Sequence, residues 1–238
     1  MGDGDPLRLV IFDMDGTLVD SAGTIVAAMQ AAFSANRLPP PGQDAVHGVI
    51  GLHLPEAIAR LCAAGGIPPL DAAAGRSLVD AYRNAFLYLD RDPDAASGLF
   101  PGILPLLDDL DGLGLLLSVA TGKGRQGMER VLGRLDLLPR FVATRTPDEC
   151  PGKPHPAMAL DLLAATGVAP ADAVVIGDSL FDMEMARNAG IAGIGVAWGT
   201  TRAELLMRSG AGAVAGTPAE LGVLIGAALG GVAIAEGD

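Results

Sequence analysis

Residues 7–21 of the chain are LRLVIFDMDGTLVDS. The apolar run from Leu7 to Phe12 is short and partly β-branched, which is typical of a buried parallel strand. Asp13 follows it directly, so a carboxylate is expected at the carboxyl end of this strand. Asp20 and Ser21 then begin a helical pattern that extends to about Arg37. A buried strand, a polar strand end and a helix, in that order, indicate an α/β protein.

The rest of the chain divides into a helical part and an alternating part. Helical patterns at 54–64 and 70–89 leave no convincing strand between residues 20 and 95. Beyond Pro101 and Gly102, strands are predicted at 115–120, 141–143, 173–176, 191–197 and near 213, and helices at 125–135, 156–166, 181–188, 201–208 and from about 218. Strands that alternate with helices favour right-handed crossovers and a parallel sheet that is covered on both faces.

The helical part lies between the first strand and the remaining strands, the order that an insertion into a loop of a sheet produces. We therefore predict an α/β fold with a Rossmann-like parallel sheet core and an inserted all-helical cap domain. The core comprises residues 1–19 and 96–238, and the cap comprises residues 20–95.

Composition limits the classes of function. With 16 basic and 28 acidic residues the net charge is -12, which argues against a nucleic-acid partner. The N-terminus lacks the pattern of a signal peptide, and no uninterrupted apolar run reaches the roughly 18 residues that a membrane span needs. We expect a cytoplasmic protein without a membrane or an obligatory protein partner, whose acidic surface is solvated.

The segment DMDGT, residues 13–17, is the strongest functional signal. Asp13 and Asp15 would alternate sides on a regular strand, but a bend at Gly16 lets both approach one point. An ionised Asp13 can attack phosphorus without a base. A plain Asp-Gly turn or a calcium-type loop could have the same sequence. The position of the segment at a strand end favours a functional role.

The segment GDSLFD, residues 177–182, repeats this arrangement after the predicted strand 173–176. Asp178 ends the strand, and Asp182 lies one helical turn later, where it could also simply complement the helix dipole. Oxygen ligands suit Mg²⁺. Several carboxylates at one site repel one another, and a divalent cation relieves that repulsion. We therefore predict a magnesium cofactor.

Two further loops supply groups that suit phosphate. Thr121 ends the strand 115–120 and can donate a hydrogen bond, and Gly122 lets a backbone N–H approach closely. Lys153 stands in a proline-rich loop that would fix its direction, so that it could pair with phosphate and Asp13. Lys123 is expected to be an ordinary solvated side chain. Because the carboxyl ends of parallel strands share one edge, these groups should lie together.

Taken together, DMDGT, Thr121, GKPHP with Lys153 and GDSLFD resemble the four motifs of the haloacid dehalogenase superfamily. The helical insertion resembles the cap of its subfamily I, including phosphoglycolate-phosphatase-like hydrolases. The resemblance implies that Asp13 is the nucleophile and a metal ligand, and that Asp15 is the general acid/base with its backbone carbonyl on the metal. It further implies that Thr121 and Lys153 bind phosphate, with Gly122 beside them. It makes Asp178 a metal ligand. It makes Asp182 a second acidic residue, outside the direct metal ligands, that orients water or Lys153, and it places Ser179 in the same outer group.

Substrate choice is expected to depend on the cap loop of residues 47–55. Its glycine Gly51 permits a bend, and His47 and His53 could contact a polar or anionic substrate, although both could also be ordinary surface residues. Arg60 is the nearest cationic candidate. The scarcity of positive charge weakens phosphoglycolate as the substrate and leaves a sugar phosphate or a phosphorylated biosynthetic intermediate as plausible.

Three functions remain open from the sequence. We favour a magnesium-dependent phosphomonoester hydrolase that acts on a small phosphorylated metabolite through an aspartyl-phosphate intermediate. A phosphomutase of the β-phosphoglucomutase kind would use the same core and would need a Lys/Arg pair for a second phosphate, of which the sequence shows no convincing example. A non-catalytic, receiver-like protein with a magnesium pocket is the third, although receivers lack a DxD followed by Gly-Thr and an insertion of this size.

Overall fold

The computed structural model describes residues 6–91 and 97–230. Its main sheet has six parallel strands in the order β5-β4-β1-β6-β7-β8. The strands are β1 (Leu9–Phe12), β4 (Leu116–Ala120), β5 (Ala143–Arg145), β6 (Ala173–Gly177), β7 (Ala192–Val196) and β8 (Ala213–Ala215). The predicted α/β fold with a parallel sheet is therefore confirmed.

Side chains of β1 alternate between two apolar clusters on opposite faces of this sheet. Val10 and Phe12 pack in one cluster with side chains of α5, α6 and α10, whereas Leu9 and Ile11 pack in another with α7 and α8. These helices are α5 (Ile103–Gly112), α6 (Arg125–Arg134), α7 (Ala157–Thr166), α8 (Leu180–Ala189) and α10 (Pro218–Ala228), and α9 (Ala203–Ser209) lies against α8. Because both faces are covered, the strands are apolar on both sides.

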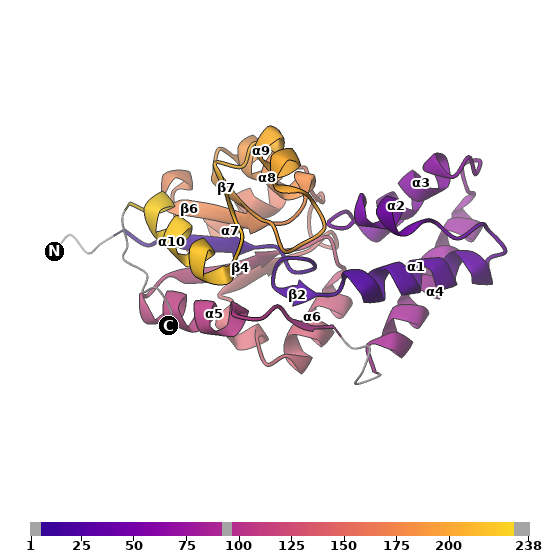
Figure 1. Ribbon diagram of the computed structural model, residues 1–238, viewed down its shortest axis with the longest axis horizontal. Coiled ribbons are helices and arrows are strands. Elements are labelled where there is room, and N and C mark those ends of the chain that lie inside the picture. The colour runs from indigo at the N-terminus through magenta and orange to yellow at the C-terminus, as the bar shows by residue number, and fades with distance from the viewer. Residues whose placement is uncertain (1–5, 92–96, 231–238) are drawn as a thin grey trace.

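Four helices form a separate lobe beside the sheet, as Figure 1 shows. They are α1 (Ala22–Ala35), α2 (Gln43–His47), α3 (Leu54–Ala64) and α4 (Ala72–Leu89). Helices α1 and α4 make the most extensive contact of any two elements in the described residues. Side chains such as Phe33 and Leu78 are buried in this lobe. The predicted helices in this part of the chain correspond to α1, α3 and α4, and α2 was not predicted.

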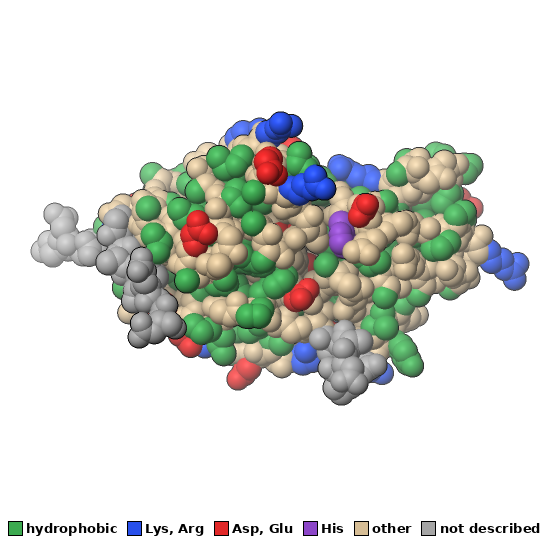
Figure 2. All heavy atoms as spheres, in the orientation of Figure 1, with side chains coloured by type: hydrophobic (Ala, Val, Ile, Leu, Met, Phe, Trp, Pro, Cys, Tyr) green, Lys and Arg blue, Asp and Glu red, His purple; other side chains and the backbone are tan. Residues whose placement is uncertain are grey.

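A short antiparallel pair connects the lobe to the sheet. Strand β2 (Val19–Asp20) pairs with β3 (Gly98–Leu99) and forms a second sheet of two strands. The chain thus enters and leaves the helical lobe through adjacent segments. Figure 2 shows that acidic side chains on this face of the molecule are scattered singly, which fits a solvated acidic surface.

Candidate active site

Three central strands, β4, β1 and β6, end next to one another and place Thr121, Asp13 and Asp178 at one edge of the sheet. All three side chains are buried. The backbone N–H of Asp13 donates to the carbonyl of Ile176 at 2.8 Å, so the end of β1 stays in register with β6. Thr121, Asp13 and Asp178, which were expected to lie together at the strand ends, do lie together.

Lys153 reaches this edge from the loop between β5 and α7. Its Nζ lies 2.5 Å from Asp13 Oδ1 and 2.5 Å from Asp182 Oδ1, and the lysine side chain has no exposed surface. Burial alone would lower the pKa of Lys153, but the two carboxylates raise it above its ordinary value. The ammonium therefore stays charged beside the Asp13 carboxylate.

Asp182 is fixed by the first turn of α8. Ser179 Oγ accepts from the Asp182 N–H at 3.3 Å, and the Asp182 carboxylate accepts from the Ser179 N–H at 3.1 Å. This reciprocal capping box begins α8 and leaves Asp182 Oδ1 directed at Lys153. Asp182 thus contacts Lys153 directly, and Ser179 holds Asp182 in place.

Two threonines hold the Asp178 carboxylate. Thr200 donates from both its N–H and its hydroxyl to Asp178 Oδ2 at 2.8 Å, and Thr17 Oγ1 donates to Oδ1 at 3.3 Å. Gly16, whose φ is +88°, lies so close that a Cβ there would overlap this carboxylate. Sequence reasoning missed Thr200, because a threonine in a loop 22 residues away has no pattern that would indicate it.

Asp13, Asp178 and Asp182 form a buried carboxylate cluster in which one ligand atom of each lies within 4.8 Å of the others. Burial raises the pKa of Asp13 above its ordinary value and raises the pKa of Asp178 to about 6, with further contributions from neighbouring carboxylates. Asp13 Oδ2 is buried and has no hydrogen-bond partner. Three carboxylates around one ammonium leave an excess of negative charge, so the donor set fits a hard divalent cation.

The Asp15 side chain points away from this cluster. Ser21 Oγ donates to Asp15 Oδ1 at 2.7 Å, and Lys123 Nζ lies 3.2 Å from Oδ2. The expectation that Lys123 is solvated is wrong: its side chain is only 12% exposed, and its Nζ lies 4.2 Å from the centre of the Phe86 ring. Phe86 belongs to α4, so this contact exists only because the helical lobe lies beside the end of β4. The sequence around Lys123 does not indicate that position.

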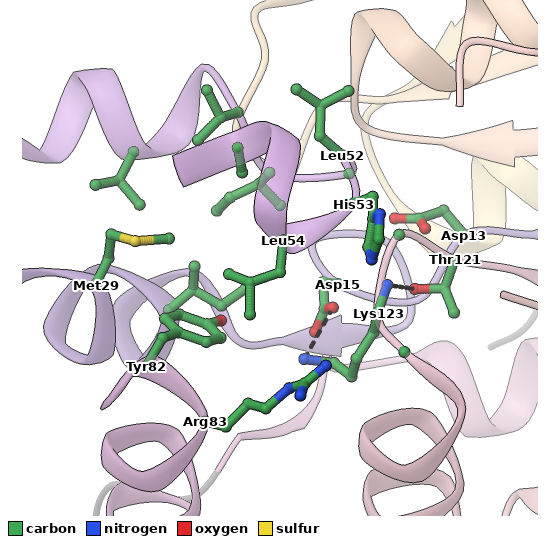
Figure 3. A pocket seen from close by; sticks show the side chains of 18 residues that line it. Asp13, Asp15, Met29, Leu52, His53, Leu54, Tyr82, Arg83, Thr121 and Lys123 are labelled. Atoms are coloured by element: carbon green, nitrogen blue, oxygen red, sulfur yellow. Dashed lines mark hydrogen bonds and ion pairs between the residues drawn. The ribbon is translucent and has the colours of Figure 1, made fainter. Parts of the chain in front are cut away.

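A cavity of about 90 Å³ lies between the sheet edge and the helical lobe. In Figure 3, Asp13, Asp15, Thr121 and Lys123 face it from one side, and Met29, Leu54 and Tyr82 face it from the other. Its wall within the lobe is mostly apolar. The site therefore has a polar end at the sheet and an apolar end under the helices.

Only some of the residues that were expected to choose the substrate lie at the cavity. Gly51 and His53 line the cavity, whereas His47 lies half-buried on α2 and does not. Burial lowers the pKa of His53 below its ordinary value, which favours the neutral ring. Arg60 does not line the cavity either, since it pairs with Glu56 and packs over Phe181.

The Lys and Arg side chains that line the cavity are those of Arg83 and Lys123. The sequence analysis did not identify Arg83. This residue is far along the chain from every motif, so no sequence pattern indicates that it lies at the mouth of the site. Figure 3 shows its side chain extending from α4 toward Lys123.

The cap loop meets the sheet edge at Gly122. A Cβ on Gly122 would overlap the carbonyl of Gly51, and a Cβ on Gly51, whose φ is +96°, would lie 2.8 Å from Ser179 Oγ. Two glycines therefore permit the loop to lie directly against the ends of β4 and β6. Thr121 Oγ1 accepts from the Lys123 N–H at 3.2 Å, which leaves its own hydroxyl proton available to a ligand.

Comparison with known proteins agrees with this geometry. Residues 10–196 match the family described as haloacid dehalogenase-like hydrolase. The chain belongs to this family. A phosphoglycolate phosphatase of Caulobacter vibrioides is 36% identical over 193 residues, covering 81% of this chain and 80% of the relative. An N-acetylmuramic acid 6-phosphate phosphatase of Pseudomonas putida is 33% identical over 226 residues, covering 94% and 98%. A crystal structure of a hydrolase from Pseudomonas syringae superposes with a TM-score of 0.81 at 29% identity, covering 91% of this chain and 96% of that one.

Membership of the haloacid dehalogenase-like hydrolases confirms the predicted superfamily and the prediction of an enzyme of the phosphatase kind, because the related chains are phosphatases. A non-catalytic receiver-like protein is thereby disfavoured. None of the helices in the described ranges combines the length and the hydropathy that a membrane crossing requires.

Proposed function

We propose that the protein is a magnesium-dependent phosphomonoester hydrolase that acts on a small phosphorylated metabolite through an aspartyl-phosphate on Asp13. The arrangement of Asp13 is the observation that supports this most strongly. One of its carboxylate oxygens is paired with the buried Lys153 at 2.5 Å, and the other is buried without a partner. Asp13 also lines the cavity, so it borders the space that a substrate would occupy.

Asp13 and Asp178 would hold Mg²⁺, together with the backbone carbonyl of Asp15, as the family resemblance implies. The unpartnered Oδ2 of Asp13 and the excess negative charge of the carboxylate cluster support this assignment. When bound, the cation would offset the repulsion between the Asp13 carboxylate and an anionic phosphate.

Each residue then has a role in two half-reactions. A carboxylate oxygen of Asp13 attacks phosphorus, the bond to the leaving oxygen breaks, and Asp15 gives that oxygen a proton. Water next attacks phosphorus, Asp15 takes its proton, and the acyl phosphate bond breaks to release inorganic phosphate. Lys153, Thr121 and the Gly122 amide hold the transferring oxygens. Ser21 and Lys123 keep the Asp15 carboxylate in place.

The helical residues above the site would choose the leaving group. His53 and Gly51 line the cavity and remain candidates for substrate contacts, whereas a role for His47 would need a movement of α2. The two relatives named above are phosphatases of different substrates, one a two-carbon acid and the other an amino sugar. We propose a small phosphorylated metabolite of this range as the substrate class, and the cytoplasm as its location.

We also propose that residues 1–19 and 96–238 form the core domain and residues 20–95 the cap domain. Helices α1–α4 all fall within the proposed cap. The second boundary lies among residues 92–96, outside the described part of the chain.

The test is release of inorganic phosphate from a panel of phosphorylated metabolites in Mg²⁺, with the wild type and Asp13→Asn. We expect turnover by the wild type and none by Asp13→Asn, because an amide is not a nucleophile toward phosphorus. Asp44→Asn, which alters an exposed carboxylate on α2, is the matched control and should keep full activity. An active Asp13→Asn protein would refute the proposal. Isomerised sugar phosphate without free phosphate would instead identify a phosphomutase.

A further inference from the structure

A second cavity of about 250 Å³ lies between α4 and α6, at the seam between the helical lobe and the sheet. Tyr82, Arg83, Lys123 and Gly124 line both this cavity and the active-site cavity. The two therefore adjoin along Lys123. We call the second one the seam chamber. Nothing in the proposed chemistry uses the space of the seam chamber.

The charged residues of the seam chamber are Arg83, Lys123, Arg130 and Asp148. Lys123 is paired with Asp15, and Asp148 Oδ2 accepts from the Arg125 N–H at 2.7 Å at the start of α6. These two groups are thus already engaged within the protein.

The two guanidinium groups are not engaged to the same degree. Arg83 has one ion pair, to Asp80 at 4.0 Å, and the side chains of Arg83 and Asp80 are each more than half exposed. Arg130 makes no ion pair within residues 6–91 and 97–230. In a chain with 28 acidic and 16 basic residues, two weakly paired arginines beside one cavity leave local positive charge next to the catalytic site. Guanidinium groups match carboxylate and phosphate oxygens with two parallel hydrogen bonds.

We propose that the seam chamber binds an anionic group at the far end of the leaving group, held by Arg83 and Arg130 with Gln126 beside them. The substrate is then a phosphomonoester whose alcohol extends past Lys123 and ends in a carboxylate or a second phosphate, longer than a two-carbon acid. This inference rests on the proposed function and narrows its substrate class.

The experiment uses the full chain in Mg²⁺ and a series of ω-phosphooxy carboxylates of two to six carbons, each paired with its neutral amide. A bisphosphate of the same chain lengths distinguishes a second phosphate from a carboxylate. The measured quantity is the anion preference, the kcat/KM of the charged substrate divided by that of its neutral partner. Arg130→Gln and Arg83→Gln are the variants. Arg76→Gln is the matched control, since Arg76 is an exposed arginine on α4 that does not line the seam chamber.

We expect an anion preference that appears only beyond two carbons and that falls about tenfold in Arg130→Gln and in Arg83→Gln, the size of a lost charge-assisted hydrogen bond. It should keep its wild-type value in Arg76→Gln, and the loss should appear in KM. Equal kcat/KM for charged and neutral substrates in the wild type would overturn the inference, as would an equal fall in all three variants. If the wild type releases no phosphate from any compound, the proposed function fails instead.

Discussion

At the scale of single residues, Lys153 is the side chain on which the site depends most. It is a fully buried ammonium that lies 2.5 Å from each of two carboxylates. Removal of one partner from a buried ion pair leaves the other charge without compensation, which costs far more than the loss of an exposed pair.

We therefore expect Lys153→Met to lower the free energy of unfolding by about 3–5 kcal/mol, measured by urea denaturation in EDTA at neutral pH. Arg140→Gln is the comparison, because the partners of Arg140, Asp108 and Asp111, are exposed, and its loss should cost less than about 1 kcal/mol. Equal costs for the two variants would contradict the buried-pair argument.

The deficit of Lys153→Met, which is the difference between its free energy of unfolding and that of the wild type, should become smaller as the pH falls. Burial raises the pKa of Asp178 to about 6 from its ordinary value of 3.8, so the folded state takes up this proton before the unfolded state does. Lys153 lowers this pKa in the wild type, so Asp178 takes up its proton at a higher pH in Lys153→Met, and the deficit becomes smaller as the pH falls toward about 6. A deficit that widens over this range would contradict the electrostatic explanation.

Residues at strand ends were predictable because a parallel sheet brings the carboxyl ends of its strands to one edge. Asp13, Thr121 and Asp178 follow this rule, and Lys153 follows from its fixed loop. Lys123, Arg83 and Thr200 do not, since their positions depend on contacts between segments far apart in the chain. Local pattern contains no information about such contacts.

At the scale of elements, most of those that the sequence analysis missed are very short. Long helices such as α1 and α4 show a full period of apolar positions, whereas α2 has 5 residues and β2 and β3 have 2 each. Helix α5 was also overlooked, because Pro101, Gly102 and Pro105 surround its start; proline is tolerated in a first turn, where the N–H has no helical partner.

The start of α4 provides a test of helix capping in the cap. Asp71 Oδ1 accepts from the N–H groups of Ala73 and Ala74 at 2.9 and 2.8 Å. Asp71→Ala should lower the free energy of unfolding by about 1 kcal/mol in a chemical denaturation experiment. Asp71→Asn, which keeps the acceptor oxygen, should cost less. Equal losses in both variants would show that these hydrogen bonds do not stabilise α4.

At the scale of the whole molecule, the chain has an internal reporter of the metal site in its one tryptophan. Trp198 Nε1 donates to the Thr17 carbonyl at 3.0 Å, and Thr17 and Thr200 both hold Asp178. We expect Mg²⁺ to change the fluorescence of Trp198 and to stabilise the fold by about 2.7 kcal/mol at a hundredfold excess over its Kd. Asp178→Asn should lose both effects, and Asp44→Asn should lose neither. An unchanged response in Asp178→Asn would place the cation elsewhere.

The helical lobe meets the sheet where Gly51 and Gly122 approach each other closely. A methyl group on Gly122 would meet the backbone carbonyls of Gly51 and Leu52, and backbone cannot yield as a flexible side chain does. Gly122→Ala should therefore hold the cap loop away from the ends of β4 and β6. The carboxylate cluster should stay intact, because its ion pairs and hydrogen bonds are made with Lys153 and with hydroxyl residues outside this loop.

We expect Gly122→Ala to lower kcat/KM for the best substrate about a hundredfold, since a displacement near 1 Å at a catalytic site has that order of effect. The Mg²⁺-dependent fluorescence of Trp198 should persist in this variant, which separates loss of closure from loss of the metal site. Gly133→Ala on α6 is the control, because a Cβ there meets nothing within 4 Å. Full activity in Gly122→Ala would mean that catalysis does not require the loop to touch the sheet, and the two glycines would then need another explanation.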